Sequence, residues 1–95
     1  MRQYPRKLNM YDPEVFAVRI QGEIGEDRVE YFGARTISTE RGESGFPVTI
    51  LTTEPVDQAG LIGLINHVNM LGLPLVSVEC LSAPEENRPS IEGKA

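Results

Sequence analysis

The sequence is poor in the residues that most often carry chemistry. It contains a single cysteine, Cys80, and a single histidine, His67, in 95 residues. One cysteine cannot form an internal disulfide, and no apolar run follows the basic residues Arg2, Arg6 and Lys7, so we expect no secretory signal and a reducing, cytoplasmic setting. One histidine and one cysteine thirteen positions later do not make a zinc pattern. We therefore expect no metal and no other cofactor.

Groups arranged for catalysis are equally scarce. No acidic or nucleophilic residue lies three or four positions from His67, and a helical histidine without such a partner is more often an exposed or interface residue than a general base. Cys80 follows two valines in a predicted strand, where a small core hydrophobe is the commoner role than a nucleophile. The glycine-containing turn at 41–45 precedes a strand instead of a helix, and so does not predict a phosphate-binding loop. We expect no catalytic residues and a protein that is not an enzyme.

Positive charge is also in deficit. The chain has 14 acidic against 9 basic residues, a formal net charge of -5. This sign disfavours general attraction to nucleic-acid backbones or to anionic membrane surfaces. We expect neither partner.

One long stretch lacks charge altogether. No Asp, Glu, Lys or Arg lies between Asp57 and Glu79, a run of 21 residues in a chain that is 24% charged. A run of this length could span a bilayer. Its middle, however, contains polar residues and helix breakers: Asn66, His67, Asn69, Gly72 and Pro74. These residues argue against a membrane span, so the missing charge needs another explanation.

The length of the chain suits a single domain. Residues 1–11 show no sustained period and are expected to be a flexible arm, while the Pro- and Glu-rich residues 83–95 are expected to be a disordered tail. Residues 12–82 are then one α+β domain. A domain this small buries only about 60% of the surface that its unfolded chain exposes, so association would stabilise it.

Alternating apolar residues predict the first and the last strand. From Glu14 onward, Phe16, Val18 and Ile20 alternate with Ala17, Arg19 and Gln21. The stretch 73–81 alternates in the same way. One face of it would carry Val76, Val78 and Cys80, and the other Leu75, Ser77, Glu79 and Leu81. Both faces are partly apolar, which is typical of a strand inside a sheet or covered by a neighbour.

The segment between these strands has one ambiguous part. Residues 27–32 fit either a strand of a hairpin or a short helix, and we favour the helix because acidic residues suit a first turn and Gly33 suits its end. Beyond it, β-favouring residues at 34–40 and 46–53 flank the turn at 41–45. This pattern predicts a β-hairpin.

The uncharged stretch begins with helical periodicity. Asp57 is placed to cap a helix by accepting hydrogen bonds from the amides of Ala59 or Gly60, and Gly72 and Pro74 end the pattern. An apolar stripe at helical spacing would cover the sheet: Leu61, Leu64, Ile65, Val68 and Leu71. The opposite side would carry Ala59, Ile62, Gly63, Asn66, His67, Asn69 and Met70. A surface helix normally displays lysines and glutamates there, so we predict that these seven residues form an interface, either in a homo-oligomer, with a dimer favoured, or with another protein.

The same region carries a resemblance. The run VDQAGLIGLI at 56–65, followed by LGLPLVSVE at 71–79, resembles the C-terminal signature V-x-D-Q-A-A-L-x-G-L-L…L-G-L-x-L-x-S-V of a widespread group of small uncharacterised bacterial proteins. The likeness is specific over 56–78 and weaker before it, and it implies no activity. In that signature the segment before L-G-L reads I-R-D, and this chain departs from its charged Arg and Asp positions, having His67, Asn69 and Met70 in this region.

A second, looser likeness is to ACT-type regulatory domains. It rests on an acidic residue and a glycine near a helix start, here Asp57 and Gly60, before an apolar stripe, a glycine and a strand. This resemblance implies a ferredoxin-like βαββαβ plan and amino-acid binding near those two residues.

The expected fold is therefore α+β: four mostly antiparallel strands, ferredoxin-like or β-β-β-α-β in order, with one main helix on one face and a possible short first helix. The expected function is a non-enzymatic interaction module that self-associates through the uncharged side of its helix. An ACT-like sensor of a small ligand is the alternative.

Overall fold

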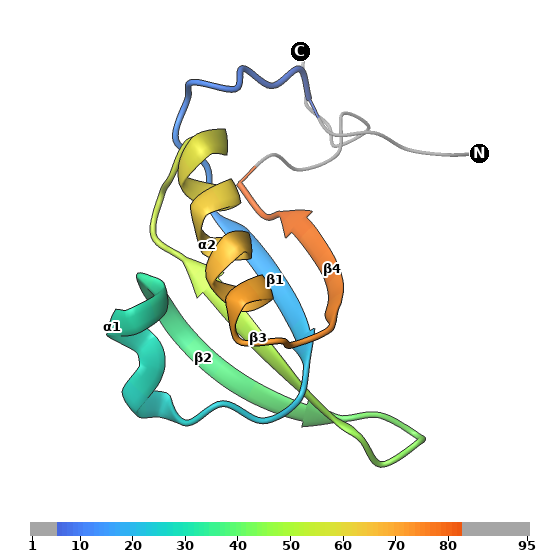
Figure 1. Cartoon of the computed structure of the whole chain (residues 1–95). Coiled ribbons are helices and arrows are strands. Elements are labelled where there is room, and N and C mark those ends of the chain that lie inside the picture. The colour runs from blue at the N-terminus through green and yellow to red at the C-terminus, as the bar shows by residue number, and fades with distance from the viewer. Residues whose placement is uncertain (1–5, 83–95) are drawn as a thin grey trace, which may run out of the picture.

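The computed structural model describes residues 6–82 of the chain. Its strands are β1 (Phe16–Gln21), β2 (Ala34–Arg41), β3 (Pro47–Thr53) and β4 (Leu75–Cys80). Its helical elements are a 3-10 turn η1 (Glu26–Arg28), the short helix α1 (Val29–Phe32) that continues it, and the main helix α2 (Gln58–Met70). Figure 1 shows α2 lying across the face of the sheet, with α1 beside β2.

The four strands form one antiparallel sheet in the order β2-β3-β1-β4. With a helical segment after β1 and another after β3, the element order is βαββαβ, the ferredoxin-like plan. The α+β class and the β2-β3 hairpin are confirmed. The ambiguous segment at 27–32 is helical, as favoured, and begins as the 3-10 turn η1.

The core lies between the sheet and the two helices. It consists of buried residues from β1, α1, β2, β3 and α2: Val18, Ile20, Phe32, Ala34, Leu51, Leu64 and Val68. Since Phe32 of α1 and Leu64 of α2 belong to the same cluster, both helices cover the same face of the sheet. The alternation in β1 is as expected, because Val18 and Ile20 are fully buried in this core.

The structure excludes one of the two positions expected for the last strand and corrects the predicted assignment of its faces. β4 pairs only with β1 and lies at an edge of the sheet, not inside it. The register also shifts, because Arg19 pairs with Ser77 whereas Ile20 pairs with Leu75, so that a β-bulge leaves Val76 unpaired. A bulge inserts one residue and changes the face of those beyond it. Leu75 therefore pairs with Ile20 and lies on the face that carries the helices. This is the face of Val78, whereas the sequence predicted that Leu75 and Val78 lie on different faces.

Candidate interaction site

Helix α2 is held by specific caps at both ends. Asp57 Oδ1 accepts a hydrogen bond from the Gly60 amide at 2.9 Å, which confirms the predicted N-cap. At the other end Gly72 adopts a left-handed φ of 73°. The Gly72 amide donates to the Asn69 carbonyl at 3.0 Å, and the Leu73 amide to the Val68 carbonyl at 3.3 Å. This pair of bonds is a Schellman motif, and it explains why the helix stops where the sequence pattern does.

The apolar stripe of α2 covers the core as expected over most of its length. Leu64 and Val68 are buried, while Leu61 and Ile65 are half-buried. The predicted stripe wrongly includes Leu71, which is the C-cap residue and is exposed. The cap turns the chain away from the helix axis, so the stripe ends at Val68.

The seven residues of the predicted interface lie on the outer side of α2. Gly63 is half-buried, and the other six are exposed. Met70 is 77% exposed and Ile62 48% exposed, high fractions for large apolar side chains. Four of these residues border different flanks of the helix: Gly63 and His67 line a groove beside α1, and Asn66 and Asn69 line a cavity beside β4.

The flank toward α1 borders a groove of about 390 Å³. Gly60, Gly63 and His67 line it from α2, and Tyr31 and Gly33 line it from α1 and the turn after it. The rings of Tyr31 and His67 are tilted by 32° with their centroids 5.3 Å apart, so they close one end of the groove against each other.

Gly60, proposed from the sequence as a ligand residue with Asp57, has a structural role in this groove. A Cβ at Gly60 would lie 3.0 Å from the Cβ of Val56 and 3.4 Å from Asp57 Oδ1. A larger residue here would crowd Val56, so glycine lets the helix begin this close to the preceding chain without a tight contact. Asp57 is engaged as the N-cap.

The flank toward β4 borders a second cavity of about 410 Å³. Asn66 and Asn69 line it from the helix and Leu75 from β4, while Leu73 and Pro74 form the connection between them. The β-bulge is what brings Leu75 into this cavity. The side chains that line it are apolar or neutral.

Residues 6–14 cover the N-terminal end of α2. The Gln58 amide donates to the Met10 carbonyl at 3.1 Å. A third cavity of about 400 Å³ lies under this segment and is lined by Leu8, Met10, Phe16 and Leu61, among others.

A buried carboxylate anchors the same segment. Arg6 Nη2 donates to both oxygens of Glu14, at 2.8 and 2.9 Å, and Ser82 Oγ donates to Glu14 Oε1. Glu14 is only 6% exposed. The bond from Ser82, followed by that from Arg6, lowers the pKa of Glu14 below its ordinary value, and the bond to Glu14 raises the pKa of Arg6. This contact joins the segment before β1 to the chain after β4.

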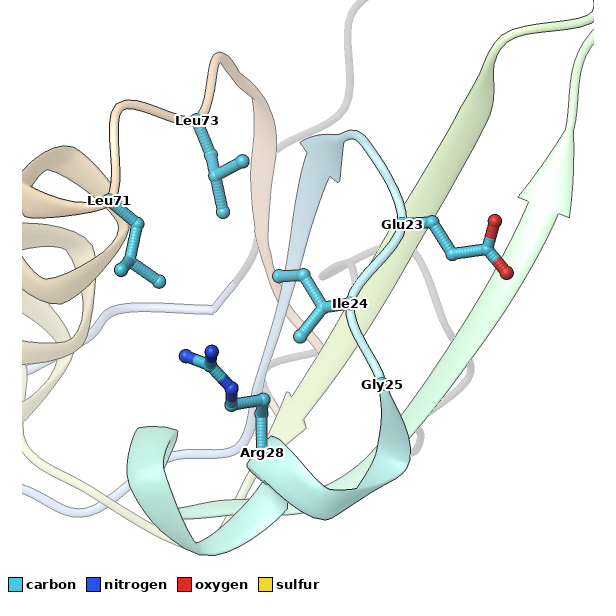
Figure 2. A pocket seen from close by; sticks show the side chains of 6 residues that line it. All are labelled: Glu23, Ile24, Gly25, Arg28, Leu71 and Leu73. Carbon is cyan, nitrogen blue, oxygen red and sulfur yellow. The ribbon is translucent and has the colours of Figure 1, made fainter.

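A smaller pocket of about 260 Å³ lies where the loop after β1 meets the end of α2. Figure 2 shows the Arg28 side chain reaching into the space between Leu71 and Ile24, with Leu73 above them and Glu23 pointing away. Arg28 also lies over the Tyr31 ring, 5.8 Å from its centroid. The pocket is open and shallow, and Arg28 is the cation in its lining.

Within residues 6–82 the structure shows no group of three or more His, Cys, Asp or Glu side chains placed to hold a metal ion. In the same range no helix has the length and apolar character needed to cross a membrane. Cys80 is half-buried on the edge strand. His67 has the Tyr31 ring as its neighbour.

Sequence reasoning missed two features of this surface. The Glu14 and Ser82 contact joins residues 68 positions apart, and no local pattern indicates such a pair. The approach of Tyr31 to His67 also depends on how α1 and α2 pack. The only available signal was the aromatic pair at 31 and 32 in the short predicted helix, which identifies a buried and an exposed ring but not what the exposed ring contacts.

The topology and the single helical layer define the chain as a small α+β domain of ferredoxin-like plan. A family model described as Domain of unknown function (DUF8691) matches residues 15–79, so the chain belongs to that family. The match covers every strand and helix except the last residue of β4. It agrees with the expectation of an uncharacterised family and assigns no activity. Comparison with curated proteins and with solved structures gives no match.

Proposed function

We propose that this protein is a non-enzymatic interaction module that associates with itself through the uncharged side of α2. The observation that carries the proposal is the outer surface of this helix. Over its 13 residues α2 contains no Asp, Glu, Lys or Arg, although much of it is exposed. Met70 and Ile62 are among the exposed side chains. A helix that remains in water on this side would normally carry charge.

The overall charge limits where a second copy could bind. Two chains of net charge -5 repel each other over most of their surfaces. The outer side of α2 is a surface where two copies can meet without placing like charges together. The departure from the resembled signature at His67, Asn69 and Met70 removes charge from this same side.

Multi-angle light scattering of the full chain over a wide concentration range tests the proposal. We expect a dimer that dissociates on dilution. Gly63→Arg and Met70→Lys should weaken the dimer about tenfold or more, because each places a charge in the contact. Gln21→Arg, on an exposed residue at the end of β1, is the matched control and should leave the dimer intact. A wild-type chain that stays monomeric at the highest concentration would refute self-association.

The groove between α1 and α2 favours a second candidate function, sensing of a small ligand such as an amino acid. Its volume of about 390 Å³ is in the range of ligand sites, and Gly60 of the ACT-like pattern lines it. Asp57 lies at the same end of α2. A ligand that binds only the native state must raise its stability, so a thermal-shift screen with amino acids tests this candidate. No stabilising compound at millimolar concentration would count against it.

A further inference from the structure

The two edges of the sheet differ sharply in character. β2, one edge, carries three charged residues: Arg35, Glu40 and Arg41. β4, the other edge, carries one, Glu79, whose carboxylate lies 3.4 Å from Arg19 of the neighbouring strand. Exposed edge strands invite pairing with another chain, and proteins usually block them with charges. By this criterion β2 is protected, whereas β4 is not.

β4 is also more apolar than an edge strand in water should be. Val76 is 53% exposed, Leu75 46% and Val78 39%. A strand that is apolar on both faces is typical of a position inside a sheet or under a neighbour. The sequence of β4 is therefore that of a covered strand, but within residues 6–82 nothing covers its outer edge.

Within residues 6–82 the outer edge of β4 has no strand paired with it. On the inner edge, the Leu81 amide donates to the Val15 carbonyl at 2.7 Å, which is one of the two bonds of a hydrogen-bonded pair, while the Val15 amide donates to Ser82 Oγ. Such pairs alternate along an antiparallel ladder. Glu79 therefore directs its amide and carbonyl toward β1, and Val78 and Cys80 direct theirs toward the open edge.

From these features we infer that β4 pairs antiparallel with β4 of a second copy, with the two-fold axis beside Val78, so that the two sheets join into one of eight strands. This inference rests on the proposed function and names the contact that holds the two copies together. Antiparallel pairing of a strand with itself is a two-fold contact and needs no second kind of surface. Because β2 is protected by charge, association stops at two copies.

The charges fit this register. With Val78 opposite Val78 of the partner subunit, Glu79 lies opposite Ser77 of the partner subunit, so the two glutamates do not face each other. Val76 lies opposite Cys80 of the partner subunit, an apolar pair. A basic partner would be drawn to the acidic remainder of the surface, whereas the one charge of β4, on Glu79, is already paired with Arg19.

The pairing also involves α2. Asn66 and Asn69 border the cavity that Leu75 of β4 lines from the other side, so this flank of the helix lies next to the β4 edge. In Figure 1, α2 lies over the sheet, and β4 forms the edge of the sheet on the far side of β1. Joining two β4 edges therefore brings the two α2 helices toward each other, with their uncharged flanks between them.

Introducing charge at the edge tests the inference. Val78→Lys and Val76→Lys place like charges near the axis and should weaken the dimer about tenfold or more in sedimentation velocity. Thr39→Lys, on an exposed residue of the β2 edge, is the matched control and should change the dissociation constant by less than about twofold. Circular dichroism of each variant establishes that it is folded.

Cross-linking tests the position of the axis without weakening the contact. Opposed residues of a hydrogen-bonded pair have Cα atoms about 5.5 Å apart, within disulfide range. Val78→Cys in a Cys80→Ser background should therefore give a covalent homodimer on mild oxidation. Thr39→Cys in the same background should give no covalent dimer.

Four outcomes are possible. Loss of the dimer in both β4 lysine variants, together with the Val78→Cys cross-link, supports the inference. A dimer that survives both lysine variants but is lost in Met70→Lys overturns the edge contact and leaves the proposed function standing. A wild-type monomer at every concentration overturns both. Cross-linking of Val78→Cys in cells to a different protein, without homodimer, assigns the edge to that partner and also overturns the inference.

Discussion

The two glycines of α2 that face the α1 groove should respond oppositely to the same substitution. Gly63 lies in the interior of the helix, and a Cβ built there meets no atom within 4 Å. Glycine in a helix interior costs about 1 kcal/mol relative to alanine, because it loses more backbone freedom on folding. Gly63→Ala should therefore raise the free energy of unfolding by about 1 kcal/mol, which corresponds to about 4–8 °C in Tm for a domain of this size.

Gly60→Ala is the matched control. Replacing Gly60 by alanine also reduces the backbone freedom that is lost on folding. The new Cβ, however, would lie 3.0 Å from the Cβ of Val56. Val56 cannot easily move, because its amide and carbonyl are both bonded to Glu14, each at 2.9 Å. Crowding of this kind costs about 1–3 kcal/mol. Gly60→Ala should therefore leave the stability unchanged or lower it.

Urea denaturation followed by circular dichroism measures both effects. The wild type and the two variants should have equal m-values, so that differences in midpoint report stability alone. Measurements at several protein concentrations separate folding from association, since a dimer becomes more stable as its concentration rises. A gain for Gly60→Ala equal to or above that for Gly63→Ala would refute the reasoning from local space.

Two further predictions concern the cap and the buried carboxylate. Asp57→Ala should lower the free energy of unfolding by about 1 kcal/mol because it removes the N-cap bond, and Asp57→Asn, which retains an acceptor, should lose much less in the same urea titration. The bonds from Ser82 and Arg6 hold the pKa of Glu14 in the folded state below its ordinary value of 4.5. The Glu14 carboxylate therefore stabilises the fold above pH 4.5. This stabilisation is lost as the pH falls through the lowered pKa of the folded state. Glu14→Gln should therefore be less stable than the wild type at pH 7, with the difference shrinking in acid; thermal unfolding at pH 7 and pH 3 measures this, and an unchanged difference would contradict it.

Much of the fold was predictable because its signals are local. The N-cap at Asp57, the left-handed Gly72 and the apolar stripe define α2 within a few residues of sequence. The hairpin and the first strand likewise follow from alternation and turn residues over short windows. Each of these signals involves residues no more than about four positions apart, so they survive in any tertiary arrangement.

The candidate site was predictable only in part. The absence of charge from α2 is visible in the sequence, and the exposed positions follow from helical spacing. The sequence does not show that Gly63 and His67 border one cavity while Asn66 and Asn69 border another, because this depends on where α1 and β4 lie beside the helix. Tyr31 meets His67 only because α1 packs against the same face of the sheet.

The sequence by itself determined the order of the elements, the helix boundaries and the uncharged surface. Only the tertiary structure decided that β4 is an edge strand, that a bulge turns Leu75 toward α2, and that Glu14 joins the two ends of the described chain. The physical reason is that a strand looks the same in sequence whether one or two neighbours pair with it. Pairing is a long-range property, and a strand that is apolar on both faces shows only that it is covered. The fold then shows that any cover on the outer edge of β4 must come from outside residues 6–82.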